Sequence, residues 1–168
     1  MLQFRETPVD DPEAHALLEA YFAERVATFP DPAGYTTRYP DPAAFVPPEG
    51  VFLLIDLETG GAQEQPEPVR GVACGGIRRL PPLADGRVRY EVKHLYVAPG
   101  GRGRGLGRIL LAELERRAAD LGADLIVLDT NDSLRAAGGL YRSSGYRTTE
   151  PYNDNPNATT WYAKDVVR

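Results

Sequence analysis

The sequence is poor in the residue types that build disulfides and metal sites. Its 168 residues include one cysteine, Cys74, and two histidines, His15 and His94. A single cysteine excludes a disulfide within the chain, and two distant histidines do not provide the ligand spacing of a metal centre. We therefore expect no bound metal, and we interpret Cys74 as a small buried residue.

Long apolar runs and an excess of positive charge are also absent. No run approaches the roughly 20 apolar residues that a membrane-spanning helix needs, and the opening residues MLQFRETPVDD lack the pattern of a secretory signal. The formal net charge is -5, which disfavours nucleic acid and acidic membrane surfaces as partners. We expect a cytoplasmic protein with no membrane partner and no nucleic-acid partner.

The chain contains neither a repeat nor a linker long enough to divide it, so we expect one domain over residues 1–168. Two segments are rich in proline and glycine. The first, 29–50, also carries several aromatic residues, which favours an ordered loop with a helical turn. The second, 58–68, is interpreted as the tip of a hairpin.

Hydrophobic periodicity predicts an α/β fold. Apolar residues recur at helical spacing in three segments, 12–26, 106–121 and 134–141. Patterns typical of strands occupy 2–4, 51–57, 69–80, 87–97, 123–130, 146–150 and 159–167. Asp11 is the expected start of the first helix, and Gly122 and Gly145 are the expected ends of the other two. This order predicts an α+β mixed sheet of about seven strands with flanking helices.

The stretch VAPGGRGRGLGRILLAELERRAADLG, residues 97–122, passes from a strand end through glycines and arginines into an amphipathic helix. A helix start leaves backbone N–H groups without partners and carries partial positive charge, so it attracts anions. Glycine allows a phosphate to approach these N–H groups closely. The stretch therefore predicts a site for a dianion such as pyrophosphate.

The spacing of the glycines excludes two common phosphate motifs. A P-loop needs lysine and then serine or threonine after its second glycine, whereas Gly105 is followed by Leu106 and Gly107. A dinucleotide-binding G-x-G-x-x-G fingerprint also fails, because no glycine stands at its last position. The pattern that fits is R-x-x-G-x-G, beginning at Arg102.

With the residues around it, this pattern resembles the GNAT superfamily of acetyl-CoA-dependent N-acetyltransferases. Residues 91–131 resemble that superfamily's fourth strand, pyrophosphate loop, helix and fifth strand, and residues 136–166 resemble its next helix and last two strands. The first half of the chain agrees only in the order of its elements. The resemblance implies a GNAT-like acyl-CoA N-acyltransferase fold, with acetyl-CoA as co-substrate.

The resemblance also implies which residues bind acetyl-CoA. The backbone N–H of Leu95 is expected to bind the thioester carbonyl, and that of Val97 the pantetheine arm. Many relatives carry asparagine where this chain has Leu134, and Asn131 is expected to take its polar role. The expected cofactor-binding residues are Leu95, Tyr96, Val97, Arg102, Gly103, Arg104, Gly105, Leu106, Gly107, Arg108, Asn131 and Tyr141.

Acyl transfer to an amine needs a base for the amine, donors for the oxyanion and an acid for the departing thiolate. Glu91 occupies the strand position where some superfamily members keep a carboxylate base. Its alternative is an ordinary strand residue in a salt bridge with Lys93 or Arg89. Tyr141 matches the superfamily's tyrosine near the CoA sulfur, and the resemblance implies that it is the acid that protonates the departing thiolate. The alternative role for Tyr141 is that of an aromatic residue in the core. His94 is expected to pack rather than to catalyse.

The acceptor is expected between loop 29–50 and loop 151–157. There Tyr35, Tyr39 and Asp154 offer an aromatic and acidic lining suited to a cationic amine, although turns commonly use such residues. We therefore predict an enzyme that transfers acetyl to a small-molecule or peptide amine by direct attack in a ternary complex. A catalytically inactive acyl-CoA-binding or sensory module is the alternative, and the oligomeric state stays open, a homodimer included.

Overall fold

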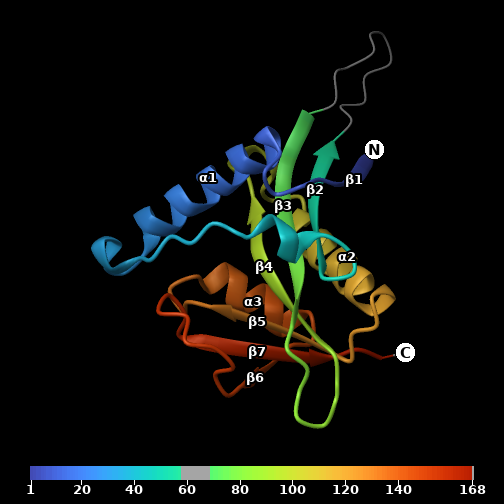
Figure 1. Cartoon of the computed structure of the whole chain (residues 1–168). Coiled ribbons are helices and arrows are strands. Elements are labelled where there is room, and N and C mark those ends of the chain that lie inside the picture. The colour runs from blue at the N-terminus through green and yellow to red at the C-terminus, as the bar shows by residue number, and fades with distance from the viewer. Residues whose placement is uncertain (58–68, 168) are drawn as a thin grey trace.

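The computed structural model describes residues 1–57 and 69–167, so the hairpin tip expected at 58–68 lies outside the described residues. The order of its elements confirms the order expected from the sequence (Figure 1). The helices are α1 (Pro12–Thr28), α2 (Leu106–Asp120) and α3 (Arg135–Ser143), with short 3-10 turns at η1 (Pro32–Gly34), η2 (Pro42–Phe45) and η3 (Pro99–Gly101). The strands are β1 (Leu2–Glu6), β2 (Gly50–Leu57), β3 (Val69–Leu80), β4 (Arg89–Val97), β5 (Leu125–Thr130), β6 (Arg147–Thr149) and β7 (Thr160–Asp165).

In the described residues the strands form one seven-stranded sheet, in the order β1-β2-β3-β4-β5-β7-β6. Neighbouring strands are antiparallel except for β4 and β5, which are parallel. A parallel pair needs a crossover connection, and α2 supplies it. The mixed sheet expected from the sequence is thus confirmed. None of the described helices combines the length and apolar character needed to cross a membrane.

The helix ends follow the signals in the sequence. The Asp11 side chain accepts a hydrogen bond of 2.9 Å from the N–H of Glu13, and Pro12 opens the first turn of α1. Gly122 and Gly145 lie just after α2 and α3 with φ of 89° and 88°. In this left-handed conformation glycine avoids the strain of a Cβ atom, so these two positions end their helices.

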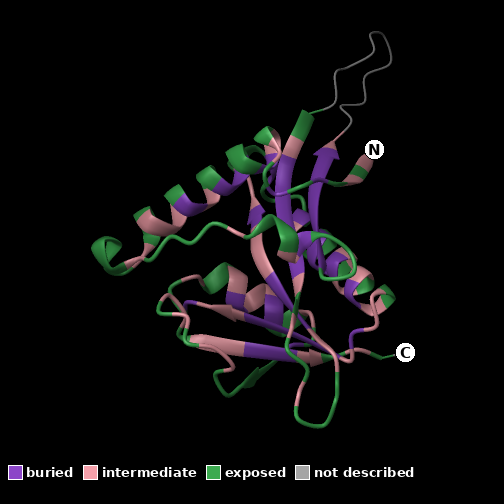
Figure 2. Cartoon of the chain, viewed as in Figure 1, coloured by how far each residue is buried: buried purple, intermediate pink, exposed green. Residues whose placement is uncertain are grey.

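Helices cover both faces of the sheet. Successive residues of a strand point to opposite faces, and in β2 Phe52 and Leu54 pack with α1 whereas Leu53 and Ile55 pack with α2. The same alternation gives β2 its buried colour along almost its whole length in Figure 2. Helix α3 lies on the α2 face, where Tyr141 joins the core.

Strand β4 contains a bulge. Tyr96 pairs with Cys74, but Lys93 pairs with Gly76, so two residues of β4 oppose a single residue of β3. His94 is one of these two and has a φ of 56°. A bulge bends its strand and changes which residues face each side. The irregular half of β4 is therefore the half that follows Lys93.

Strands β4 and β5 separate within the sheet. Their pairing extends from Arg89 opposite Leu125 to Glu91 opposite Val127 and goes no further. Beyond this point the bulged half of β4 and the carboxyl end of β5 have no strand between them. The sheet is therefore open at its centre, on the side where both parallel strands end.

Candidate active site

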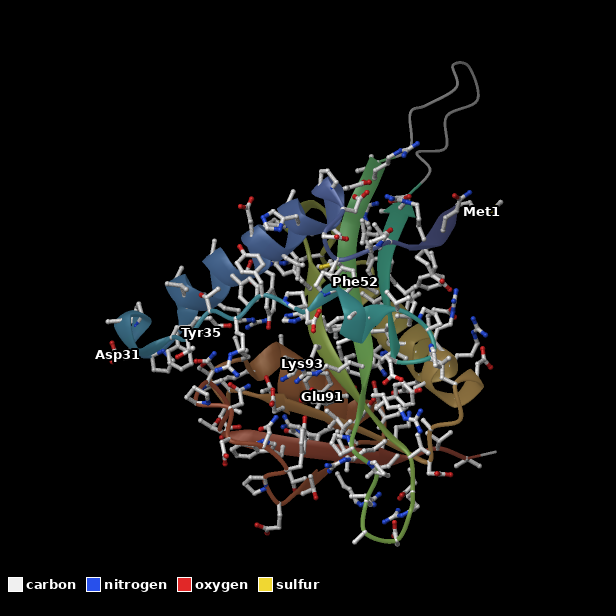
Figure 3. The ribbon with its side chains drawn as sticks, in the orientation of Figure 1. Met1, Asp31, Tyr35, Phe52, Glu91 and Lys93 are labelled. Carbon is white, nitrogen blue, oxygen red and sulfur yellow. The ribbon has the colours of Figure 1, made fainter. Side chains whose placement is uncertain are left out.

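A cavity of about 460 Å³ occupies the opening between β4 and β5. Its walls come from α1, the loop that follows α1, the bulged half of β4, the end of β5, the start of α3 and the β6–β7 loop. In Figure 1, α1 lies on one side of this opening, and α3 lies on the other with β5, β6 and β7. Figure 3 shows Lys93 near the centre of the molecule and Tyr35 farther out, toward the end of α1. Parts of the chain that are distant in sequence thus meet at the position where the sheet opens.

The bulge directs backbone N–H groups of β4 toward the opening. The N–H of Ala98 donates to the carbonyl of Val72 on β3, at 2.9 Å. The N–H groups of an antiparallel strand alternate between its two edges. Those of Leu95 and Val97 therefore face the other edge, from which β5 has separated. The structure thus turns toward the opening the two N–H groups that the resemblance assigns to acetyl-CoA.

The start of α2 presents a row of N–H groups without acceptors. Gly105 occupies the cap position with a φ of 73° and provides no side-chain cap. Within the described residues, the N–H groups of 103–107 donate no hydrogen bond. A Cβ atom at Gly103 or Gly105 would meet nothing within 4 Å, so the space near these groups is open. Unpaired N–H groups at a helix start attract anions. The geometry is compatible with the pyrophosphate site expected for this loop, which stays a prediction.

Gly107 has a different environment. A Cβ atom there would lie 3.6 Å from the Leu140 side chain and 3.8 Å from that of Val97. Both distances are those of ordinary van der Waals contact, so a small side chain at this position would pack against β4 and α3 without a clash. Gly107, in the first turn of α2, is thus close to Val97 on β4. Leu95, two residues before Val97, lines the cavity, so the start of α2 lies near the cavity.

The three arginines expected around the anion differ in how far the protein itself engages their charges. Arg102 donates to the Glu24 carboxylate at 2.5 Å, which fixes it to α1. Arg108 donates to the Ser143 hydroxyl at 2.7 Å, at the end of α3. Arg104 makes no hydrogen bond or ion pair to any residue that the structure describes. Of the three, Arg104 has the charge most available to a bound anion.

Tyr141 lines the cavity and also belongs to the core. Its ring centroid lies 6.0 Å from that of Tyr146 and 5.8 Å from that of Tyr162. Burial raises the pKa of the Tyr141 phenol, so the hydroxyl keeps its proton at neutral pH. The position is compatible both with a core aromatic residue and with an acid in the cavity.

Glu91 is fully buried and does not line the cavity. Its Oε2 accepts from Arg78 at 2.7 Å, and its Oε1 lies 3.1 Å from Lys93 Nζ and accepts from the Tyr152 hydroxyl at 2.9 Å. The salt bridge with Lys93 confirms one expectation from the sequence, although the second cation is Arg78 rather than Arg89. A carboxylate surrounded by donors in this way favours a role in holding the site together.

Asp129, at the end of β5, extends this ionic network to the cavity wall. It accepts from Lys93 at 2.9 Å, from Asn153 at 2.7 Å and from Asn155 at 3.1 Å. Burial alone would raise the pKa of Asp129, but the Lys93 charge and the amide donors hold it below its ordinary value. Burial would likewise lower the pKa of Lys93, whereas Glu91 and Asp129 raise it. Both groups therefore stay charged, and the β6–β7 loop is anchored to them.

The residues expected at the acceptor site lie together. Tyr35, Tyr39 and Asp154 line the same cavity as Tyr141. The Tyr39 ring stacks on His15 with centroids 5.3 Å apart, and burial raises the pKa of Tyr35. Asp154 is exposed and forms no hydrogen bond or ion pair with the residues described. The structure thus joins the two loops into one wall, with a free carboxylate on it.

Asn131 is committed to the protein itself. Its Nδ2 donates to the carbonyl of Asn157 at 3.0 Å, and its Oδ1 accepts from the N–H of Ser133 at 3.0 Å. The side chain therefore ties the end of β5 to the β6–β7 loop. Its expected contact with acetyl-CoA stays a prediction.

His94 lines the cavity, which the sequence did not predict. It packs as expected, with ring centroids 5.5 Å from Tyr21 and 5.6 Å from Phe22. Its Nδ1 is buried and has no partner among the described residues. Burial, followed by the charges of Lys93 and Arg78, lowers the pKa of His94 to about 3. The imidazole is thus neutral in the folded protein. His94 lies in the β4 bulge, which the sequence did not predict, and this explains why its place in the cavity wall was not expected.

Solved structures of other proteins share this fold. An acetyltransferase of the GNAT family from Staphylococcus aureus is 18% identical, with a TM-score of 0.71 over 98% of this chain and 99% of its own. The structure of yncA from Salmonella typhimurium with its cofactor acetyl-CoA is also 18% identical, with a TM-score of 0.63 over 100% of this chain and 95% of its own. At this identity the likeness concerns the fold, which is that of the acyl-CoA N-acyltransferases.

The family follows from the sequence. Residues 14–146 match the family described as "Acetyltransferase (GNAT) family", and the chain belongs to this family. An uncharacterized N-acetyltransferase of Schizosaccharomyces pombe is 36% identical over 118 residues, which make up 70% of this chain and 64% of the relative. The match therefore spans less than two thirds of that relative's length.

Proposed function

We propose that this protein transfers an acetyl group from acetyl-CoA to an amine. The observation that carries the proposal is the row of unpaired N–H groups at 103–107, beside open space and next to a cavity at the sheet opening. Such a row suits a pyrophosphate, because the helix start adds partial positive charge and Arg104 adds a free guanidinium. The residues that fit the acetyl-CoA phosphates thus follow directly after β4, and the bulged half of this strand lines the cavity together with the residues that suit an amine.

Acetyl-CoA supplies the acetyl group as a thioester, which an amine nitrogen attacks directly. The nitrogen gains the bond to the acetyl carbon, the carbon–sulfur bond breaks, the amine loses one proton and the sulfur gains one. The N–H groups of Leu95 and Val97 face the opening and are suited to bind the carbonyl oxygen and the pantetheine arm. Tyr141, whose phenol stays protonated, is suited to donate the proton that the sulfur needs.

The acceptor half of the cavity is suited to an amine. Tyr35 and Tyr39 provide aromatic faces that attract a cation, and Asp154 provides an exposed carboxylate. Glu91 is enclosed by its own partners. We assign it to the scaffold of the site rather than to removal of the amine proton.

The test is a screen for acetyl-CoA-dependent thiol release with the full chain and a panel of primary amines, polyamines, amino acids and short peptides. Sustained release that depends on one class of amine, with acetylated product identified by mass spectrometry, is expected. Calorimetric binding of acetyl-CoA without release for any amine would instead indicate an acyl-CoA-binding module. No binding of acetyl-CoA would overturn both assignments.

A further inference from the structure

The two loops of the acceptor wall are joined by one side chain. Asn157 donates from Nδ2 to the carbonyl of Thr36 at 2.8 Å, and its Oδ1 accepts from the N–H of Thr36 at 3.0 Å. The two residues are 121 positions apart in the sequence and both line the cavity. A side-chain amide that pairs with both backbone groups of one residue acts as a short bridge. This bridge, which we call the latch, connects the loop after α1 to the β6–β7 loop.

The latch is held by a ladder of alternate asparagines in the β6–β7 loop. Asn155 Oδ1 accepts from the N–H of Asn157 at 3.1 Å, and Asn153 Oδ1 accepts from the N–H of Asn155 at 3.3 Å. Trp161 on β7 donates to the same Asn153 oxygen at 2.8 Å. The Asn131 side chain fixes the carbonyl of Asn157 from the end of β5. Each asparagine thus positions the next one along the loop.

The inner end of the ladder rests on buried charge. The Nδ2 atoms of Asn153 and Asn155 donate to Asp129 at 2.7 and 3.1 Å, and Lys93 holds this carboxylate from the other strand. A carboxylate only accepts hydrogen bonds, so the amide nitrogens must face it and the amide oxygens must face the loop N–H groups. Chemistry therefore fixes the orientation of both amides. The latch is the outer end of a chain of contacts that begins in the ionic network.

The size of the cavity limits what the latch can enclose. At about 460 Å³ it lies in the lower part of the range of roughly 300–1,000 Å³ found for small-molecule sites. Under the proposed function this space must hold both the reacting end of acetyl-CoA and the acceptor amine. The latch joins two loops that line this space, so it limits how far they can separate to admit an amine attached to a longer chain.

From this geometry we infer that Asn157 determines acceptor specificity: its latch to Thr36 closes the acceptor end of the cavity and selects a compact free amine over the amino terminus of a peptide. The inference rests on the proposed function, since it assigns the substrate class of the same site. Asn157 acts by enclosing the acceptor and takes no part in proton transfer.

The test compares Asn157→Ala and Asn157→Asp with the full wild-type chain. Alanine removes both bonds to Thr36. Aspartate keeps an oxygen that accepts from the Thr36 N–H, but in place of the Nδ2 donor it has a second oxygen that cannot donate to the Thr36 carbonyl. Thr37→Ala is the matched control, because Thr37 is exposed, adjoins Thr36 and does not line the cavity. The substrates are the best compact amine from the screen and peptides of two, four and six residues with free amino termini.

We expect Asn157→Ala to lower the ratio of kcat/KM for the compact amine to kcat/KM for the peptides at least tenfold. The change should come from KM for the amine, and Asn157→Asp should show a smaller shift in the same direction. Thr37→Ala should keep the wild-type ratio. An unchanged ratio in Asn157→Ala, or a wild-type preference for the hexapeptide, would overturn the inference.

Hydrogen exchange at the Thr36 amide separates this inference from the proposed function. Exchange should be at least tenfold faster in Asn157→Ala than in the wild type and unaltered in Thr37→Ala. Equal exchange in the wild type and Asn157→Ala would show that the latch does not form in solution, even where the enzyme is active. If the wild type transfers acetyl to no amine, the proposed function fails and the inference about specificity fails with it.

Discussion

Arg78 and Glu91 face each other across strands β3 and β4, with both Nε and Nη2 of the arginine 2.7 Å from Oε2 of the glutamate. The carboxylate is fully buried and the guanidinium is partly exposed. Such a pair depends on both members, since removal of one leaves an uncompensated charge. The relationship therefore gives a way to decide what Glu91 does.

Glu91→Gln should lower the free energy of unfolding by about 3 kcal/mol, because Arg78 and Lys93 lose a buried counter-ion. Urea denaturation measures the change, and Asp85→Asn, which affects an exposed ion pair with Arg87, should change stability little. The pH dependence of kcat should keep its shape in the folded variant. A stable variant with a flattened pH profile would identify Glu91 as the base.

Gly105→Asp should weaken acetyl-CoA binding by roughly tenfold or more, because the loss of one charge-assisted hydrogen bond has an effect of this size. The new carboxylate would bind the free N–H groups at the start of α2 itself and repel a pyrophosphate. Calorimetry measures the affinity. Gly86→Asp is the matched control, because Gly86 also has a positive φ and open space around it but lies in the turn between β3 and β4. Equal affinity in both variants would argue against an anion site at α2.

Tyr141→Phe should reduce kcat by roughly 10²-fold, as expected for loss of a general acid, with little change in acetyl-CoA affinity. Tyr146→Phe removes a neighbouring buried hydroxyl that does not line the cavity and should keep kcat. Steady-state thiol release measures both variants. If the two behave alike, Tyr141 acts only as a core residue.

His94 should make the protein less stable in mild acid. The pKa of His94 is about 3 in the folded state and near 6.5 in an unfolded chain, so between these values the unfolded state binds the extra proton. The free energy of unfolding should therefore fall with decreasing pH below 6.5, by up to about 1.4 kcal/mol per pH unit. Urea denaturation at a series of pH values from 7 to 5 measures the free energy of unfolding. It should depend less steeply on pH in His94→Gln than in the wild type, and an equal dependence in both would contradict the prediction.

Asp154→Ala should raise KM for the amine and leave KM for acetyl-CoA unchanged, because Asp154 is exposed on the acceptor wall and has no partner among the described residues. Asp132→Ala is a useful comparison, since Asp132 is a loop carboxylate that does not line the cavity. Unaltered amine kinetics in Asp154→Ala would make it a turn residue only.

Local signals in the sequence were sufficient for the elements of the fold. Asp11, Gly122 and Gly145 predict helix ends because capping depends on neighbouring residues and on φ alone. The glycine-rich start of α2 was predictable for the same reason, since the glycines after Val97 and the helix that follows them are contiguous in the chain. Periodicity likewise predicted the order of strands and helices, which the structure confirms.

The contacts within the site depend on register between strands, which a single sequence does not reveal. The second cation of Glu91 is Arg78 because the β3–β4 register places them opposite each other. His94 reaches the cavity because of a bulge whose position depends on the facing strand. The alternation of Asn153, Asn155 and Asn157 resembles an ordinary turn in the sequence, and its meaning depends on Asp129 and Thr36, which are distant in the chain.

The opening between β4 and β5 has a mechanical consequence. In the part of the chain that the structure describes, β4 and β5 pair at three positions near Arg89 and separate beyond them, so the two halves of the sheet resemble two plates joined at one end. A ligand that touches both strands beyond the joint fastens the plates together at their free end. A ligand bound in the opening should therefore limit how far the two plates can move apart. Because a ligand that binds only the folded state raises its stability by mass action, the melting temperature of the whole chain should rise as the opening is occupied.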